Sequence, residues 1–486
     1  MSNEINSLYP DTLWKNFNDL CGIPRPSKHE EKVTEFVKNF GEGLGLKTIV
    51  DEVGNVIIKK PATPGMQDRM GVVLQGHLDM VPQKNSDVEH DFIKDPIQPY
   101  IDGEWVTARG TTLGADNGMG VAAAMAVLQS KEIQHGPVEA LFTIDEETGM
   151  TGAFALKPGL LDGDILINMD SEDEGELYIG CAGGVDTNVR FRYNEESVPD
   201  GMEAFELKIS GLKGGHSGLD IDLGRGNANK LMNRFLSYAQ DNFGIRLASF
   251  KGGDLRNAIP REAFATVVVP AAQKEEFLNG VKKYEELYRS EYNTPEPGLT
   301  LTASPAGMPS SVIDKKTQEN LIRSVYACPN GVIGKIADMP EVVETSTNLA
   351  IVKAENGIID VCSLLRSSVD TLKDDLANMI QCVFELAGAE VEHTGSYPGW
   401  KPNVDSPVLK TMKSVYEKMY SVTPEVKVIH AGLECGIIGD VYPDMDLISF
   451  GPTIRFPHSP DEKVNIETVG KFWDFLLETL KNIPSK

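Results

Sequence analysis

Short apolar runs of strand length recur in this sequence and alternate with segments of helical character. The runs 72–74, 140–142 and 165–167 are each bounded by polar or turn residues, a pattern typical of buried strands. The small and apolar residues 120–128 predict a tightly packed helix between the first two strands. Strands that alternate with helices favour an α/β domain.

Amphipathic helices are expected on either side of this α/β region. The sequence Ser27-Lys28-His29-Glu30 resembles a capping box, with Ser27 as the N-cap of a helix whose apolar face includes Val33 and Val37. Near the end of the chain, residues 466–480 carry apolar side chains at helical spacing, which predicts a closing helix.

The residues that follow the predicted strands are of the types that bind metal ions. In an open α/β sheet, the crevice at the carboxyl ends of the strands is where sites form. A single acidic residue there is more often a helix cap, but clustered carboxylates repel one another unless a cation compensates them. Five segments of the chain contribute such residues, namely His77, Asp79, Asp116, Asp145, Glu146, Glu147, Asp170, Glu172 and His458.

Imidazole nitrogens mixed with carboxylate oxygens suit zinc, and also manganese or cobalt, better than calcium or magnesium. The chain has six cysteines, and none accompanies these five segments. This absence argues against a closed structural zinc site and favours an open, catalytic one.

The charge of the chain excludes some partners. Its 46 basic and 72 acidic residues give a formal net charge of −26, which disfavours nucleic acids and anionic membranes. No apolar run approaches the roughly 20 residues that span a bilayer. The first residues do not resemble a signal peptide, and the scattered cysteines read as reduced thiols, so we expect a cytoplasmic protein.

At 486 residues the chain is too long for one hydrophobic core, and two domains are expected. Residues 205–209 alternate between apolar and charged, which is typical of an antiparallel sheet with one wet face. We therefore predict a discontinuous α/β domain, 1–186 and 397–486, that hosts an inserted domain, 187–396.

The insert contains a faint internal repeat that predicts two copies of a small α+β unit. The segments that begin at Asn257 and Asn348 each lead into a strand and then a helix. The predicted strands are 265–269 and 358–365, and the predicted helices are 275–287 and 371–386.

Together, the strand-end motifs resemble those of the co-catalytic di-zinc metallopeptidases, a family that includes aminoacylases and carnosinases. The resemblance extends over essentially the whole chain. It implies a zinc-exopeptidase-like catalytic domain, with a mixed β-sheet flanked by helices, and an inserted α+β lid domain. It also implies two zinc ions per chain, with manganese or cobalt as alternatives. The implied ligands are His77 and Asp170 for one ion, Glu147 and His458 for the other, and Asp116 as the bridge.

The resemblance implies roles for two further acids beside these ligands. Asp79 would accept a hydrogen bond from His77 and so fix its tautomer. Glu146 would be the general base that takes a proton from a water activated by the metal pair. In this family the peptide bond after the bridging aspartate, here Asp116–Asn117, is typically cis.

Three residues of the insert resemble the substrate-binding residues of the family. The glycine-rich segment 213–218 resembles the lid motif, whose histidine, here His216, binds the oxyanion. Asn257 resembles a contact to the substrate carboxylate or backbone. Arg366 resembles the clamp for the substrate carboxylate, for which a planar guanidinium is well suited.

The segment 430–436 departs from the glycine-rich form that is common among relatives, and we expect it to be a substrate-facing loop that includes Gly432. For Glu434, an anchor for a substrate ammonium group and a capping carboxylate are both open.

In many relatives the lid dimerises, and its histidine and asparagine reach the active site of the partner. Here His216 and Asn257 fall in the first half of the doubled insert, whereas Arg366 falls in the second half. We therefore hypothesise that the first half takes the partner's role and supplies His216 within the same chain. The chain itself could be a monomer or a homodimer.

The resemblance implies hydrolysis of dipeptides with free termini, including those that end in histidine. The alternatives are an aminoacylase or other amide hydrolase, or an aminotripeptidase, on the same two-metal site. An inactive relative used as a binding module would lack a ligand or the base, yet every position is present. A calcium-binding acidic protein is disfavoured by the two histidines and by the lack of an Asp-rich loop.

Overall fold

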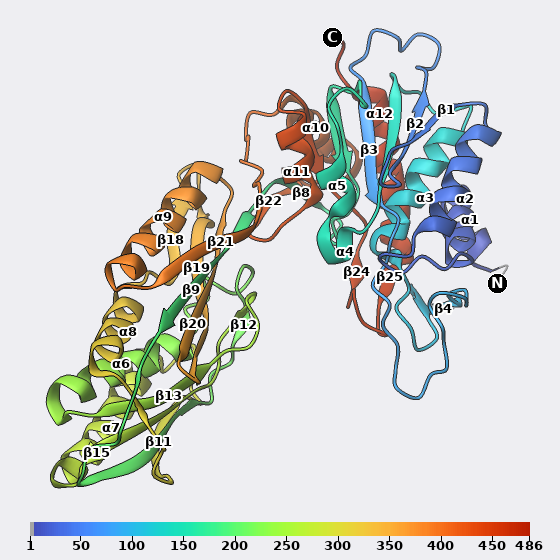
Figure 1. Ribbon diagram of the computed structural model, residues 1–486. Helices are drawn as coiled ribbons and strands as arrows, with labels where there is room; N and C mark the ends of the chain where they lie inside the picture. Colours follow the sequence, from blue (N-terminus) through green and yellow to red (C-terminus); the bar gives the residue numbers. More distant parts are fainter. Residues whose placement is uncertain (1–3) are drawn as a thin grey trace. The chain divides into compact units, whose positions relative to one another are not determined.

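The structure, a computed structural model, describes residues 4–486 and divides into two compact units (Figure 1). Unit 1 comprises Met1–Gly180, Trp400–Val428 and Leu433–Lys486, and unit 2 comprises Cys181–Gly399 and Ile429–Gly432. The segment 429–432, predicted as part of the α/β domain, thus belongs to unit 2. Within the described part of the chain, no helix combines the length and the apolar character that crossing a membrane requires.

Unit 1 is built on an eight-stranded mixed sheet. Its strands β3, β6, β7 and β23 pair in parallel, and the flanking pairs β1–β2, β2–β6 and β23–β8 are antiparallel. The three apolar runs predicted as strands lie in β3, β6 and β7, in which every residue is buried. In spatial order the strands are β1 (Lys47–Val50), β2 (Val56–Lys60), β6 (Val138–Thr143), β3 (Val72–His77), β7 (Ile165–Asn168), β23 (Asp446–Ser449), β8 (Glu176–Cys181) and β22 (Glu425–Ile429).

Helices cover this sheet, so the predicted mixed sheet flanked by helices is confirmed. α3 packs on β3, α2 packs on β1 and β2, and α10 and α11 pack on β23. The helices of unit 1 are η1 (Ile5–Ser7), α1 (Asp11–Cys21), α2 (Glu31–Gly43), α3 (Ala115–Gln129), α4 (Glu146–Gly149), α5 (Thr151–Ala155), α10 (Pro407–Tyr420), α11 (Glu434–Val441) and α12 (Ile466–Asn482). A smaller sheet of the same unit has the order β24 (Ile454–Arg455), β25 (Lys463–Asn465), β5 (Trp105–Ala108) and β4 (Pro99–Asp102).

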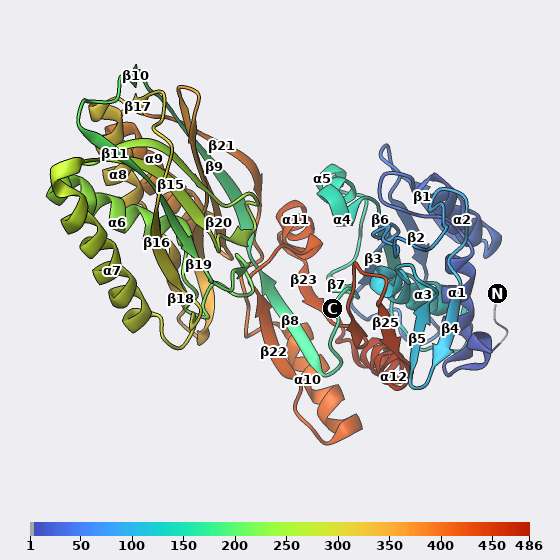
Figure 2. The same ribbon diagram turned by 90° about the horizontal axis from the view of Figure 1, so that it is seen from below.

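Unit 2 is a nine-stranded sheet with helices along one face (Figure 2). All its strand pairs are antiparallel, as the alternating pattern at 205–209 predicts. In spatial order the strands are β16 (Thr300–Pro305), β11 (Met202–Ser210), β15 (Ala263–Pro270), β13 (Arg246–Gly252), β19 (Met339–Glu355), β20 (Ile358–Ser367), β9 (Gly183–Arg192) and β21 (Glu390–Tyr397), with β18 (Gly331–Ile336) on β19. Two short ladders join β10 (Glu195–Glu196) to β17 (Val312–Ile313) and β12 (Gly215–His216) to β14 (Ala258–Ile259).

The helices of unit 2 lie where the internal repeat places them. β15 leads into α7, and β20 leads into α9, so both predicted strand–helix successions are confirmed. α7 packs on β15 and β16, whereas α9 packs on β20, β9 and β21, at the other end of the same sheet. The helices are α6 (Ala228–Phe243), η2 (Ala271–Gln273), α7 (Lys274–Glu291), α8 (Lys315–Ala327) and α9 (Asp370–Leu386).

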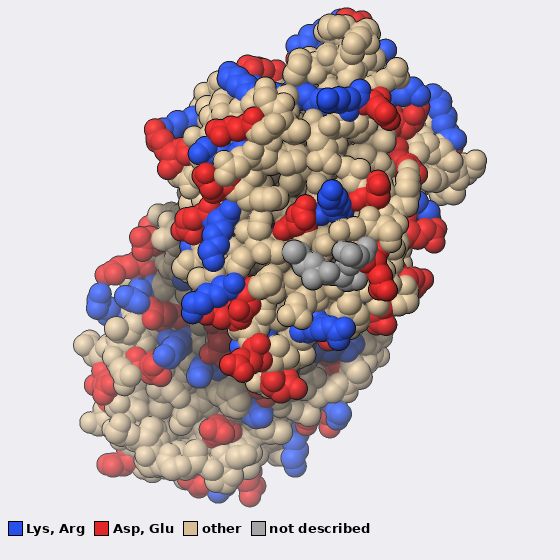
Figure 3. All heavy atoms as spheres, turned by 90° about the vertical axis from the view of Figure 1, so that its right-hand side faces the viewer, with Lys and Arg blue, Asp and Glu red and all other residues tan. Residues whose placement is uncertain are grey.

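The surface of the molecule carries charges of both signs. Figure 3 shows one face, on which acidic side chains are interspersed with basic ones. On this face, the formal net charge of −26 is therefore not gathered in a single acidic patch.

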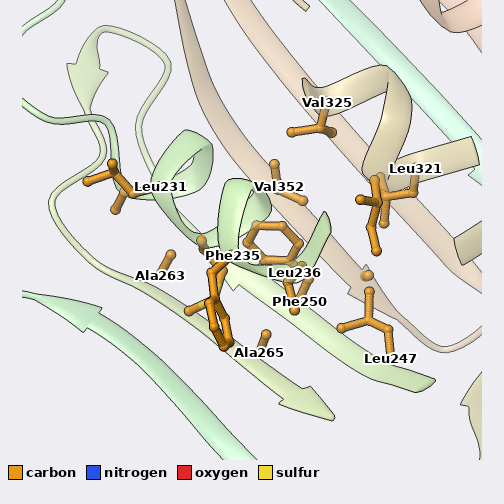
Figure 4. Packing of buried hydrophobic residues seen from close by; sticks show 14 of the residues in the cluster. Leu231, Phe235, Leu236, Leu247, Phe250, Ala263, Ala265, Leu321, Val325 and Val352 are labelled. Atoms are coloured by element: carbon orange, nitrogen blue, oxygen red, sulfur yellow. The ribbon is translucent and has the colours of Figure 1, made fainter. Parts of the chain in front are cut away.

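The core of unit 2 is an apolar layer between the sheet and its helices (Figure 4). Phe235 of α6 is completely buried there, with ring centroids 5.9 Å from Phe277 and 5.4 Å from Tyr284. Phe235→Ala is expected to destabilise the unit by about 3–5 kcal/mol, because the cavity forfeits packing as well as apolar burial.

Thermal denaturation of the full chain measures this effect as a lower transition temperature. The control is Leu386→Ala, since Leu386 is 91% exposed and its removal opens no cavity. Equal shifts for the two variants would contradict the packing that is described here.

Candidate metal centre

The predicted ligand residues lie at the ends of the central strands of unit 1. His77 is the last residue of β3, Glu147 lies in α4 just after β6, and Asp170 follows β7 by two residues. Asp116 is the second residue of α3, and His458 lies in the loop between β24 and β25. Because β3, β6 and β7 are parallel, their carboxyl ends share one edge of the sheet, and the ligands meet there.

Asp116 lies between the two histidines. Its Oδ1 is 3.0 Å from Nε2 of His77, and its Oδ2 is 3.1 Å from Nε2 of His458. Asp170 Oδ1 is 3.3 Å from the same nitrogen of His77, and Glu147 Oε2 is 3.0 Å from that of His458. Three groups with the spacing of a metal site lie here, His77–Asp116–Asp170, Asp116–Glu147–His458 and His77–Glu146–Glu147. The first two share Asp116 and contain the five predicted ligands, and we call them the ligand groups.

The electrostatics of these groups fit a cation. Glu147 Oε1 and Asp170 Oδ1 are buried and accept no hydrogen bond. Burial, reinforced by Asp116 and Glu147, raises the pKa of Asp170 to about 7. Hydrogen bonds to Asp116 and Glu147 raise the pKa of His458 to about 11, so without metal this imidazolium compensates the carboxylates. Imidazole and carboxylate donors with orphaned oxygens are the set that zinc, manganese or cobalt would complete.

Asp79 connects His77 to the start of α4. It is fully buried, and its Oδ1 lies 3.3 Å from Nδ1 of His77. Its carboxylate also accepts hydrogen bonds from the backbone N–H groups of Glu146, at 3.0 Å, and Glu147, at 3.2 Å. Burial alone would raise the pKa of Asp79, but the hydrogen bonds from His77 and these partners hold it at about 2. Asp79 therefore remains ionised and orients both His77 and the turn that carries Glu146.

Ser27 belongs to this network and not to a helix cap. Its hydroxyl donates to Asp79 Oδ2 at 2.8 Å. The helix α2 begins at Glu31 with Glu30 as its N-cap residue, without a side-chain cap bond. The predicted capping box is therefore wrong, because the buried carboxylate of Asp79 is the acceptor that Ser27 reaches.

A separate group of buried acids, Glu30, Asp79 and Asp145, also has metal-like spacing. Glu30 Oε1 accepts from the backbone N–H groups of Lys28, at 2.8 Å, and Asp145, at 3.1 Å. The carboxylate of Asp145 accepts from the hydroxyls of Thr148 and Thr151. Since all three carboxylates are already bonded to protein donors, this group holds the loop before α4 together.

Glu146 is positioned beside the two ligand groups. Burial, together with the neighbouring Asp170, Glu434 and Glu147, raises its pKa well above the usual range for glutamate. A carboxylate with a raised pKa is suited to accept a proton and return it. Glu172, two residues beyond Asp170, has its pKa raised to about 8 by burial and by the charges of Asp116 and Asp170.

The peptide bond between Asp116 and Asn117 is cis, as the family resemblance implies. Asn117 donates its side-chain N–H to the carbonyl of Met169 at 2.6 Å, next to Asp170. The strand ends and the start of α3 are thus joined through side chains as well as through the ligand groups.

His216 lies in unit 2, on the short ladder between β12 and β14. The backbone N–H groups of Gly218 and Leu219 donate to its Nδ1 at 3.2 and 3.1 Å. Burial and the charge of Arg366 lower its pKa. Because Nδ1 accepts these two bonds, the neutral ring carries its proton on Nε2. Asn257 is next to this histidine, because the Ser217 N–H donates to the Asn257 carbonyl at 2.8 Å.

Arg366, of β20 in the same unit, is only 5% exposed. Its Nη1 donates to the hydroxyl of Tyr397 at 3.2 Å, while its Nε is buried without a partner. The Arg366 charge reaches a second imidazole as well. Burial, this charge and His216 lower the pKa of His430 to about 3.

The segment 429–432, with the predicted substrate contact Gly432, belongs to unit 2. The Ala182 N–H donates to the carbonyls of Ile429 and Ala431, at 3.0 and 3.1 Å. The His430 Nε2 lies 2.7 Å from the Ser346 hydroxyl. These contacts fix the segment that leads to Gly432.

Glu434 belongs to unit 1 and is buried there. Its Oε2 accepts from Gln75 Nε2 at 2.6 Å and from the Thr143 hydroxyl at 2.8 Å. Its side chain makes no cap bond to the start of α11, so it does not cap that helix. Two further buried residues that the sequence analysis did not single out, Arg25 and Glu462, hold the loop before Asp116. Glu462 lies four residues after His458, a spacing that the sequence shows but that alone predicts no contact.

This chain is similar to known proteins over nearly its whole length. The profile of Peptidase family M20/M25/M40 matches residues 73–482. The Cytosol non-specific dipeptidase of Escherichia coli (strain K12) is 49% identical over 483 residues, which covers 99% of this chain and all of that protein.

The chain is also similar to solved structures of peptidases. The crystal structure of aminoacylhistidine dipeptidase from Vibrio alginolyticus is 51% identical and has a TM-score of 0.96, covering 99% of this chain and 98% of that one. The aminopeptidase PepT from Bacillus cereus, at 16% identity and a TM-score of 0.57, covers 98% of this chain and 99% of that one and shares the fold. The matched residues 73–482 include all five residues of the two ligand groups, and the likeness to the E. coli protein extends over its full length. The family resemblance is thus confirmed, and this chain belongs to Peptidase family M20/M25/M40.

Proposed function

We propose that this chain is a metal-dependent dipeptidase that hydrolyses dipeptides with free termini, including those that end in histidine. The observation that carries the proposal is the pair of ligand groups that share Asp116, with Glu146 beside them. The names of the E. coli and Vibrio relatives, a cytosol non-specific dipeptidase and an aminoacylhistidine dipeptidase, support the substrate class and a cytoplasmic location.

Two zinc ions per chain, with manganese or cobalt as alternatives, would occupy these groups. His77 and Asp170 would hold one ion, Glu147 and His458 the other, and Asp116 both. Bound there, the cations would lower the pKa of a water toward about 7 and polarise the substrate carbonyl. Asp79, which faces Nδ1 of His77, leaves the Nε2 lone pair of that ring free for a cation.

Glu146 takes the proton from the attacking water and passes it to the leaving amine. Its burial and its raised pKa suit both directions of that transfer. The charge that develops on the carbonyl oxygen needs a hydrogen-bond donor, and His216 has its Nε2–H free for this purpose.

The substrate carboxylate would be bound by Arg366, whose buried Nε has no protein partner. Asn257 and the backbone at Gly432 would supply the remaining substrate contacts. Glu434 could bind the ammonium group of the substrate, because its Oε1 accepts no hydrogen bond within unit 1.

The ligand assignment predicts unequal metal losses from two substitutions. Asp116→Ala is expected to reduce the metal content from about two ions per chain to about none, since both groups lose a ligand. Asp170→Ala leaves Asp116, Glu147 and His458 intact and should retain about one ion. The measurement is elemental analysis of dialysed protein, with Asp405→Ala, at an exposed aspartate, as the control. Two ions retained by Asp116→Ala would contradict the shared ligand.

A substrate panel on metal-reconstituted protein tests the function. Ala-His should be hydrolysed, whereas N-acetyl-histidine and Ala-Ala-His should not, because a dipeptidase requires a free amino terminus and a carboxylate at a fixed distance from it. Glu146→Gln should lower kcat on Ala-His by about 10²–10⁴-fold at unchanged metal content. Preferred cleavage of N-acetyl-histidine would instead identify an aminoacylase, and preferred cleavage of the tripeptide an aminotripeptidase.

Mixed oligomers test whether His216 acts within its own chain. His216→Ala and Glu146→Ala protein, each inactive alone, are expected to stay inactive when coexpressed, because neither chain holds both groups. Activity of the mixture well above that of either variant would mean that the histidine acts across subunits. Wild-type protein coexpressed with each variant provides the control for assembly.

A further inference from the structure

One buried carboxylate holds the loop that leads to Asp116. Glu462 is 2% exposed, and its Oε2 accepts from the backbone N–H groups of Leu113, at 2.7 Å, and Gly114, at 2.9 Å. Its Oε1 accepts from those of Ala115, at 2.7 Å, and Asp116, at 3.3 Å. Four successive backbone donors therefore converge on a single side chain.

These donors are ones that the helix cannot satisfy by itself. Leu113 and Gly114 precede α3, and Asp116 and Asn117 near its start have non-helical φ/ψ, so these N–H groups lie ahead of the regular helix and need acceptors from elsewhere. The N-cap residue of α3, Gly114, has φ 73° and no side chain that could supply one. A carboxylate has two oxygens, and their lone pairs can accept all four of these hydrogen bonds.

Arg25 holds the same loop from its other side. Its Nη2 donates to the Gly114 carbonyl at 2.5 Å, and its Nη1 donates to the carbonyls of Leu78, at 2.8 Å, and Asp79, at 2.9 Å. A Cβ at position 114 would lie 2.6 Å from Nη2, so glycine allows this approach. The loop before Asp116 is thereby tied to the end of the segment that carries His77.

The backbone of Glu462 is itself fixed. Thr107 of β5 donates its hydroxyl to the Glu462 carbonyl at 2.8 Å, and the next residue, Lys463, pairs with Thr107 in the ladder between β25 and β5. The Glu462 N–H donates to the Ser459 carbonyl at 3.0 Å, one residue beyond His458. Glu462 therefore joins the turn that carries His458 to the loop that carries Asp116.

We propose that Glu462 is a positioning residue of the metal centre, which sets the distance between Asp116 and His458. Both of its oxygens are engaged by backbone donors, so it acts through the two loops and does not bind a cation. Asp116 belongs to both ligand groups, so a displacement of Asp116 would weaken metal binding by both groups. The proposal rests on the proposed function only in taking these groups as the metal ligands.

The test compares Glu462→Gln with wild-type protein in metal affinity, measured by competition with a chromogenic zinc chelator. The amide keeps the size of the side chain but replaces one acceptor oxygen by a donor that faces backbone N–H groups. The expected result is a 10- to 100-fold rise in the zinc Kd, as for other residues that orient metal ligands. Excess zinc in the assay should then recover much of the lost kcat.

The matched control is Asp461→Asn, the same carboxylate-to-amide change at the exposed neighbouring residue. It should leave the zinc Kd at the wild-type value. An unchanged zinc Kd in folded Glu462→Gln protein, with only its melting temperature lowered, would overturn the proposal and leave Glu462 a purely structural residue.

If Glu462→Gln does not fold, Thr107→Val decides, because it removes only the hydroxyl that fixes the Glu462 carbonyl. It should raise the zinc Kd roughly fivefold, the equivalent of one lost hydrogen bond. An unchanged Kd here would equally overturn the proposal. Wild-type protein that binds zinc but cleaves no dipeptide would refute the proposed function and leave the positioning role standing.

Discussion

Mutual repulsion among buried carboxylates is the constraint on which the catalytic half of this protein depends. Asp116, Glu146, Glu147 and Asp170 meet at one edge of the sheet, and burial, reinforced by this repulsion, raises the pKa values of the last three. Without metal, the charge is offset by protons on the histidines, and His458 has a pKa of about 11. A cation must therefore displace protons as it binds, which couples metal affinity to pH. A cluster of this kind is costly for folding and is explained by the ion that it can hold.

Several of these residues are brought together by features that can be recognised within single segments of the sequence. The parallel strands β3, β6 and β7 are short and fully buried, and a predicted ligand comes at the end of each strand or just beyond it. For this reason the candidate residues at these strand ends could be predicted from the sequence: a run such as 72–74 marks a strand, and His77 marks its end. The assignment of particular residues as ligands came from the family resemblance. The antiparallel sheet of unit 2, and the strand and helix that follow Asn257, could likewise be predicted from the periodicity of apolar residues. None of these inferences required knowledge of contacts between distant residues.

The residues that hold the ligands in position could not be predicted in this way. Glu462 accepts a hydrogen bond from the Asp116 N–H, 346 positions away in the sequence. Its partners are backbone groups, which every residue type carries, so the sequence gives no sign of them. Ser27 shows the opposite error, in which a local pattern predicts a contact that the structure does not contain. Its spacing to Glu30 satisfies the capping-box pattern, yet its hydroxyl reaches Asp79, 52 positions away. Local hydrogen-bonding patterns are weak predictors wherever a buried carboxylate offers a stronger acceptor.

The two histidines, His77 and His216, show how the choice of partner sets the chemistry of the same side chain. At His77, Nδ1 faces two oxygens of Asp79, the carboxylate and the backbone carbonyl, so it must donate, and the lone pair of Nε2 is left free. At His216, Nδ1 accepts from two backbone N–H groups, so the proton resides on Nε2. The first arrangement makes an imidazole that can bind a cation, and the second makes one that can donate to an oxyanion. Arg366 reinforces the second arrangement, because its charge disfavours a second proton on the His216 ring.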